Sequence, residues 1–162
     1  MLTREKLNDA EWAVVRDTPH LVIIGISSTG GSPMDELLEH TAGMKSIVDA
    51  MNSTHPLIRE IAVGQNIMQA QKSAQSWYRS LDQANRTPVA LQEKALDSMK
   101  GAIGVLRAKG GPEDLLQYLD FVQSLAMRVA RAAKEGDVLG VGGELVSAGE
   151  RKFLERLEAL TK

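Results

Sequence analysis

Glu36 and His40 are the two side chains in this sequence best placed to hold a metal ion. They lie four residues apart in a predicted helix, so a carboxylate and an imidazole share one helical face. Such pairs bind divalent ions in helical bundles, although the Glu-x-x-His signature of those sites is absent here. The alternative is a solvent-exposed face whose acidic first turn suits the helix dipole. We assign no cofactor on this pattern.

Gly140, Gly142 and Gly143 are the candidates for contacts with a small ligand, because they belong to the glycine-rich segment 136–144. Glycine permits positive φ angles and a close approach of the backbone, which suit a ligand-binding loop. The same freedom would also let two helices join through a tight turn. The sequence leaves both interpretations open.

A second glycine-containing segment has the order of a phosphate-binding turn, because the apolar run Leu21–Ile26 leads through a Ser/Gly loop into a helix. The segment lacks the P-loop lysine and the Gly-x-Gly-x-x-Gly spacing of dinucleotide sites. We therefore predict that the run is a short buried helix, which begins at Pro19 and ends in a glycine cap.

Trp77, Tyr78 and Arg79 are candidates for recognition of a partner, because they follow a helical stretch of mainly uncharged polar residues. Aromatic residues and arginine beside neutral polar groups are favoured at protein interfaces. The alternative is that Trp77 packs in the core beneath a glutamine-rich exposed face.

Two further histidines, His20 and His55, each adjoin a proline and are predicted to be capping or turn residues. No set of serine, acid and histidine can be nominated from spacing, because chain order does not reveal the geometry of a triad. Whether His20, His40 and His55 converge in space is left open.

The composition is that of an ordinary globular protein. The chain has 162 residues, 43% hydrophobic and 25% charged, with 19 basic and 21 acidic side chains. This balance disfavours disorder and a nucleic-acid partner. The longest apolar run, Leu21–Ile26, is far shorter than the roughly 20 residues that span a bilayer, so no membrane partner is expected. The chain has no cysteine, and its amino-terminal segment is charged, unlike a signal peptide. Both features favour a cytoplasmic location.

Five prolines divide the sequence into helical segments. Each follows a residue suited to a turn or a cap, and each precedes a stretch with helical periodicity. Proline suits the first position of a helix because its missing amide would have no partner there. We therefore predict that a helix starts at Pro19, Pro33, Pro56, Pro88 and Pro112.

The segment Pro33–Met51 has the clearest helical pattern, and Ser32 with Asp35 forms a predicted cap at its start. Its apolar residues recur at spacings of three and four, which predicts one buried face. The residues expected to face the core are Met34, Leu37, Leu38, Thr41, Met44, Ile47, Val48 and Met51. All methionines after Met1 fall on such stripes, where they would fill the core or line an adaptable apolar pocket.

Similar stripes predict five more helices, joined to the others by short connections. These helices are expected at 2–16 with Thr3 as cap, at 56–81, at 88–106, at 112–133, and after the capping box of Ser147 and Glu150. We therefore expect an all-α fold, with one domain spanning residues 1–162 as a bundle of about six to seven helices.

The carboxy-terminal pattern resembles that of a family of uncharacterised bacterial all-helical proteins. The likeness rests on Ala132-Ala133-Lys134-Glu135-Gly136, Leu139-Gly140, Gly142-Gly143, Val146-Ser147, Glu150 and Leu154, and on Trp12, Arg16-Asp17 and Pro19-His20. It implies a helical fold and brings no established activity. A looser likeness is to tellurite-resistance-type helical domains, whose acidic Asp-Gly turn is replaced here by Ser28-Thr29-Gly30 and Gly136-Asp137.

No catalytic template is met, so our leading hypothesis is a non-enzymatic interaction or scaffold protein that acts as a homo-oligomer or through a protein partner. The alternative is a protein, enzymes included, that binds a small molecule or a divalent metal. Its site would lie near the turns at Gly30 and Gly140 and the helix that carries Glu36 and His40.

Overall fold

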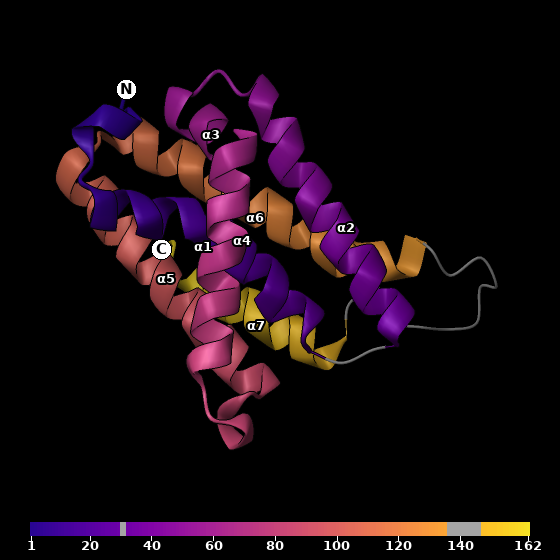
Figure 1. Ribbon diagram of the computed structural model, residues 1–162. Helices are drawn as coiled ribbons and strands as arrows, with labels where there is room; N and C mark the ends of the chain where they lie inside the picture. Colours follow the sequence, from indigo (N-terminus) through magenta and orange to yellow (C-terminus); the bar gives the residue numbers. More distant parts are fainter. Residues whose placement is uncertain (30–31, 136–146) are drawn as a thin grey trace.

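The computed structural model is built from α-helices, and it describes residues 1–29, 32–135 and 147–162, with the side chains of all of these except 133–135 (Figure 1). This part of the chain contains seven α-helices, three short 3-10 helices and no strand. The expected all-α helical bundle is confirmed.

The elements follow one another through short connections in the described ranges. In chain order they are η1 (Arg4–Lys6), α1 (Asp9–Ser27), α2 (Pro33–Asp49), η2 (Ala50–Asn52), α3 (Pro56–Ile61), α4 (Gly64–Ser80), η3 (Gln83–Asn85), α5 (Pro88–Lys109), α6 (Pro112–Glu135) and α7 (Ala148–Ala159). None of these helices combines the length and the apolar character needed to cross a bilayer.

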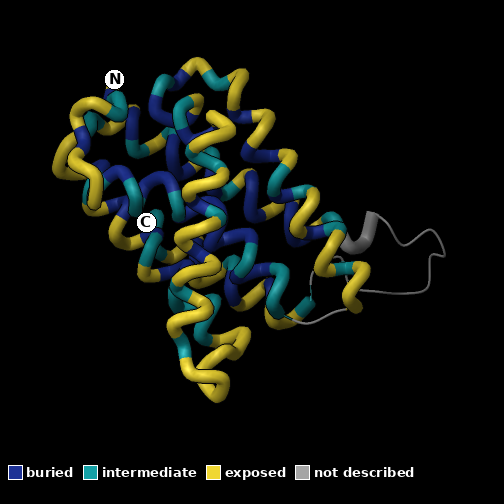
Figure 2. Tube along the Cα trace, in the orientation of Figure 1, coloured by how far each residue is buried: buried dark blue, intermediate teal, exposed yellow. Residues whose placement is uncertain are grey.

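Helix α1 is the centre of the bundle. It packs most closely on α5 and also contacts α2, α4, α6 and α7. In Figure 2 α1 is mainly dark blue, while exposed segments recur along α2 and α4 in front of it. The reason lies in the sequence of its second half, because Val22, Ile23 and Ile26 are completely buried and a helix that is apolar all round needs neighbours on every side.

Pro19 is inside α1, so the prediction that a helix begins there is wrong. A proline within a helix leaves the carbonyl group four residues earlier without its usual amide donor. That carbonyl belongs to Val15, and the buried hydroxyl of Tyr118 on α6 donates a hydrogen bond to it at 2.8 Å. A tertiary contact therefore replaces the missing backbone hydrogen bond, and α1 continues to Ser27.

Two other boundaries differ from the predictions. The first long helix is capped by Asn8, which forms a capping box with Glu11, and not by Thr3. The predicted helix 56–81 is divided into α3 and α4, because Val63 is extended. The side chain of Asn66 donates to the carbonyl oxygen of Glu60 at 2.7 Å, and so satisfies a carbonyl group near the end of α3.

The apolar stripe of α2 faces mainly outward. Ile47 is buried as predicted, and Leu38 and Met44 are half-buried, with Met44 packed against the core, whereas the predicted burial is wrong at Met34, Leu37, Thr41, Val48 and Met51. The buried residues of α2 are Glu39, Gly43, Ser46 and Ile47. Gly43 is the point of closest approach to α1, because a Cβ atom there would lie 2.5 Å from Cγ1 of Ile23. Apart from Ile47, the helix packs mainly through small and polar residues, and most of its large apolar side chains are left on the other side.

Helices α5, α6 and α7 bury the stripes that were predicted for them. Helix α6 buries Tyr118, Leu119, Val122, Leu125, Ala126 and Val129. The helix starts at Pro33, Pro56, Pro88 and Pro112 are confirmed, as are the capping boxes of Ser32 with Asp35 and of Ser147 with Glu150. Of the methionines expected in the core, Met99 is buried, whereas Met34, Met51, Met68 and Met127 are exposed.

Candidate binding cleft between helices α2 and α4

A cleft of 390 Å³ lies between α2 and α4, and residues of α1 and α5 complete its walls. Figure 1 shows α2 and α4 diverging from the end of the molecule near α3, with α1 behind them. The lining residues are His20, Leu21 and Ile24 of α1, His40 of α2, Gln71, Ala74, Gln75, Trp77 and Tyr78 of α4, and Leu91 of α5. The lining is mostly apolar with a few polar groups, which is the usual composition of a small-molecule site.

The amino acids of α4 explain why a cleft forms here. Its buried residues are Ala70 and Ala74, whose short side chains let the helix lie close to α1. The larger Trp77 and Tyr78 follow near its carboxy-terminal end, where they line the cleft. Nearer the amino-terminal end of α4, the side-chain amide of Gln71 contacts Sδ of Met44 on α2 at 3.8 Å. The two walls therefore meet at Gln71 and separate beyond it.

His20 is the buried polar residue of the cleft. It is 3% exposed, and its Nε2 atom is closed to water and has no hydrogen-bond partner. Burial lowers the pKa of His20 to about 4, with smaller contributions from the positive charges of His40 and Arg16. The imidazole is therefore neutral at physiological pH, and one of its nitrogen atoms lacks the partner that buried polar groups normally have.

His40 and Glu36 are both exposed on α2, one helical turn apart. His40 lines the mouth of the cleft, whereas Glu36 does not. Within the described ranges no group of three or more His, Cys, Asp or Glu side chains is arranged to hold a metal ion. Within the described part of the chain, no third metal ligand therefore lies beside Glu36 and His40, and metal binding by this pair stays a prediction.

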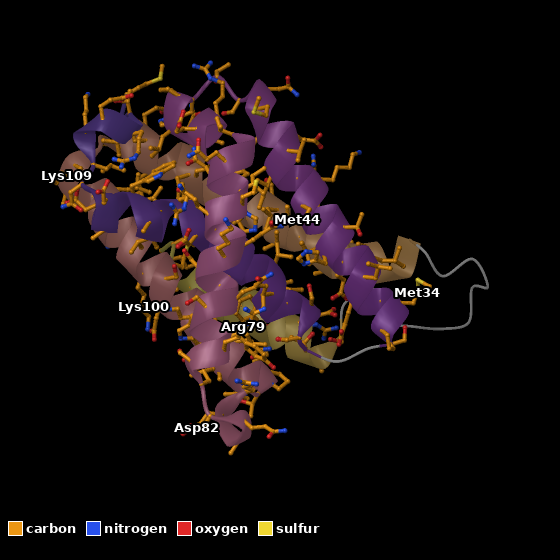
Figure 3. The ribbon with its side chains drawn as sticks, in the orientation of Figure 1. Met34, Met44, Arg79, Asp82, Lys100 and Lys109 are labelled. Atoms are coloured by element: carbon orange, nitrogen blue, oxygen red, sulfur yellow. The ribbon has the colours of Figure 1, made fainter. Side chains whose placement is uncertain are left out.

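Of the three predicted interface residues, the structure brings Trp77 and Tyr78 to the cleft. Trp77 is half-buried, and Nζ of Lys94 lies 5.4 Å from the centroid of its ring. Tyr78 is exposed beneath the guanidinium of Arg86. Arg79 is also exposed but lies outside the lining, low on α4 in Figure 3.

The polar face of α4 has an internal role that the sequence did not reveal. The guanidinium of the buried Arg16 donates to Oε1 of Gln69 at 2.7 Å and to Oγ of Ser73 at 3.4 Å. It also pairs with Asp17 at 2.7 Å. Part of the uncharged surface therefore binds a charge of α1 and is not available to a partner.

His55 does not join His20 and His40. It is the N-cap residue of α3, as predicted, but its Nε2 contacts Oδ1 of the buried Asp114 at 2.7 Å. Asp114 also accepts hydrogen bonds from the backbone amides of Leu2 and Gly111, at 2.6 and 2.8 Å. Burial acts to raise the pKa of Asp114, but these hydrogen bonds outweigh it and hold the pKa at about 2. The position of Asp114 in the first turn after Pro112 was the only sequence signal for this structural tie.

A second buried acidic residue, Glu39, lies on the inner face of α2 near Glu150 of α7. Burial and the neighbouring Glu150 carboxylate raise the pKa of Glu39 to about 8, so Glu39 holds a proton at neutral pH. Glu150 itself accepts from the amide of Ser147 in the capping box of α7. This carboxyl pair links α2 to α7 and was not predicted.

The outward-facing apolar residues of α2 form a regular row, here named the outer stripe. Four of its members are more than half exposed, namely Met34 (62%), Leu37 (59%), Val48 (52%) and Met51 (51%). With Thr41 and the half-buried Met44 they are spaced 3, 4, 3, 4 and 3 residues apart, which is the heptad spacing of a coiled-coil seam. Figure 3 shows Met34 at the start of α2 and Met44 on the side toward α4.

Two larger grooves, of 530 and 740 Å³, lie between α2 and α6. Both are lined by Asp49 and Arg128, which pair with each other at 3.5 Å across the groove. The lining of both grooves includes charged side chains, whereas that of the cleft between α2 and α4 is mostly apolar, so the cleft is the better candidate for a small-molecule site. The candidate ligand residues Gly140, Gly142 and Gly143 lie outside the described residues, as does Gly30.

No family model, curated protein or solved structure matches this chain. The family resemblances stated from the sequence therefore remain predictions.

Proposed function

We propose that this protein is a non-enzymatic helical interaction protein that self-associates through the outer stripe of α2. The carrying observation is that α2 presents the apolar side of a heptad pattern to solvent, while its small and polar side packs on the domain. Large exposed apolar patches usually mark a protein interface, since exposure to water is unfavourable for them.

A second copy of the chain is the partner that this surface suits best. A row of mainly apolar side chains can pair with itself about a two-fold axis, which is the commonest symmetry of homodimers. At 1.5 Å per residue the outer stripe is about 26 Å long. Two such helices side by side would bury roughly 1,000 Å², near the lower limit of specific interfaces, so we expect a weak and reversible dimer.

Sedimentation equilibrium over a range from micromolar to millimolar protein tests this proposal. The wild-type mass should rise from 17.6 kDa toward twice that value as concentration increases. Val48→Asp should stay monomeric, because it places a charge within the apolar row, between Met44 and Met51. Val89→Asp is the matched control, since Val89 is exposed at the start of α5, away from the outer stripe, and this variant should dimerise like wild type.

The proposal fails if the wild-type protein is monomeric throughout the range, or if Val48→Asp and Val89→Asp reduce association equally. The cytoplasmic location favoured by the sequence belongs to this proposal. The alternative function, binding of a small molecule, is supported by a different observation, which concerns the cleft and His20.

A further inference from the structure

We propose that the cleft between α2 and α4 binds a small uncharged aromatic molecule that carries one hydroxyl group, with the hydroxyl bonded to Nε2 of His20. The inference is independent of self-association. It rests on the size and lining of the cleft and on a buried nitrogen atom without a partner.

The size and the lining define the body of the ligand. Leu21, Ile24, Ala74 and Leu91 offer apolar contacts, and Trp77 and Tyr78 offer aromatic ones. Aromatic side chains favour offset or edge-to-face contact with other rings. An apolar cavity of about 150 Å³ can hold one benzene molecule. The 390 Å³ of this cleft therefore leave room for one or two rings.

The uncharged lining favours a neutral ligand, because the nearby cations of Lys94 and Arg86 already lie over the rings of Trp77 and Tyr78. None of the described residues that line the cleft is Asp, Glu, Lys or Arg. A charged group placed against Leu21 and Ile24 would lose its hydration without gaining a counter-ion. His40 stands at the exposed mouth, where water screens it. The ligand is therefore neutral.

His20 defines the polar group of the ligand. Leaving a buried imidazole nitrogen without a hydrogen bond costs free energy, which a ligand can recover by bonding to it. A hydroxyl group is suited to this role because it can donate or accept, and so fits either tautomer of the neutral ring. Because Nε2 is closed to water in this structure, the hydroxyl reaches it only when lining side chains move. Gln75 and Tyr78 line the cleft and are exposed, so they can rotate to admit it, since exposed rotamers interconvert rapidly.

Titration of the ¹⁵N-labelled protein with p-cresol and with toluene, followed by ¹H–¹⁵N NMR, tests the proposal. The two probes differ only in the hydroxyl group. We expect p-cresol to shift the indole signal of Trp77 and the amide of Ala74, and to bind at least tenfold more tightly than toluene. The indole of Trp12, which lies under Arg4 and outside the cleft, is the internal control and should not shift.

Variants of the two cleft histidines isolate the hydroxyl contact. In His20→Phe the preference for p-cresol over toluene should fall below threefold, because the ring remains and the nitrogen atom is gone. His40→Phe, the same change at the mouth, should keep a tenfold preference. His20→Gln should keep most of it, since its amide can still bond to a hydroxyl.

Equal binding of the two probes to wild type, shifts centred away from the cleft, or an undiminished preference in His20→Phe would each overturn the proposal. If His20→Phe does not fold, as judged by circular dichroism, the wild-type comparison decides the matter. Repeating both titrations in Val48→Asp separates this site from self-association, because that substitution removes the proposed dimer and leaves the cleft residues unchanged.

Discussion

Helices α2 and α6 carry apolar stripes of similar regularity, but the bundle buries only the stripe of α6. Val122 in the middle of α6 has no exposed surface, whereas Val48 on α2 is 52% exposed. The difference lies on the opposite faces. That of α2 carries Gly43, which allows close packing on α1, and small or polar buried residues, and α2 also packs on α6. The opposite face of α6 carries exposed Asp120, Met127 and Arg128 instead. An apolar stripe thus shows that a helix needs a partner, and the partner can lie outside the domain.

The largest effect expected from this comparison is that of a charge introduced into each stripe. Val122→Asp should lower the free energy of unfolding by more than about 4 kcal/mol or prevent folding, because it buries an unpaired charge. Val48→Asp should change the same quantity by no more than about 0.5 kcal/mol, because the carboxylate stays in water. Urea unfolding at low micromolar protein, where the proposed dimer is dissociated, measures both. A large loss in Val48→Asp would mean that the outer stripe is part of the monomer core.

A smaller effect tests the hydrogen bond that Tyr118 of α6 makes with α1 at the centre of the bundle. Tyr118→Phe leaves the carbonyl oxygen of Val15 without a donor and should cost about 1–3 kcal/mol. In a Pro19→Ala background the new amide at position 19 can donate to Val15, so the same substitution should cost less than about 1 kcal/mol. Thermal or urea unfolding of the four proteins in this cycle gives the coupling. Strictly additive losses would show that Tyr118 does not replace the amide that Pro19 lacks.

The smallest effect concerns the polar face through which α2 packs. The pKa of Glu39 is raised to about 8, so the folded protein favours its protonated form. The stabilisation from that proton is complete below the ordinary glutamate pKa and is lost as pH rises from about 4.5 to 8. Glu39→Gln keeps an uncharged group there and should therefore weaken this decline in stability by roughly 1–2 kcal/mol between pH 5 and pH 8.

Urea unfolding at several pH values measures how the free energy of unfolding of Glu39→Gln changes with pH. Glu36→Gln is the matched control on the same helix. Glu36 is exposed and is the weakest of the neighbouring charges that raise the pKa of Glu39, so the pH dependence of stability in this variant should stay close to that of wild type. A wild-type slope in Glu39→Gln would show that Glu39 is already ionised in the folded protein at neutral pH.

The candidate site was only partly visible in the sequence. Trp77, Tyr78 and His40 were singled out by residue type, and the structure brings all three to one cleft. The sequence predicts different roles for them, because nothing local indicates that α4 lies beside α2. The sequence predicts that His20 is a capping or turn residue, because it adjoins Pro19. Its place in the wall of the cleft follows from the continuation of α1 through that proline.

The sequence by itself determined the local features of this protein: the helices, the capping boxes at Ser32 and Ser147, the four proline starts and the buried face of α6. These depend on hydrogen bonds and periodicities within a few residues, which the order of amino acids specifies directly. Only the tertiary structure decided the outward face of α2, the continuation of α1 through Pro19, and the tie at Asp114. Each depends on contacts between residues far apart in the chain, where several helices compete for the same apolar neighbours.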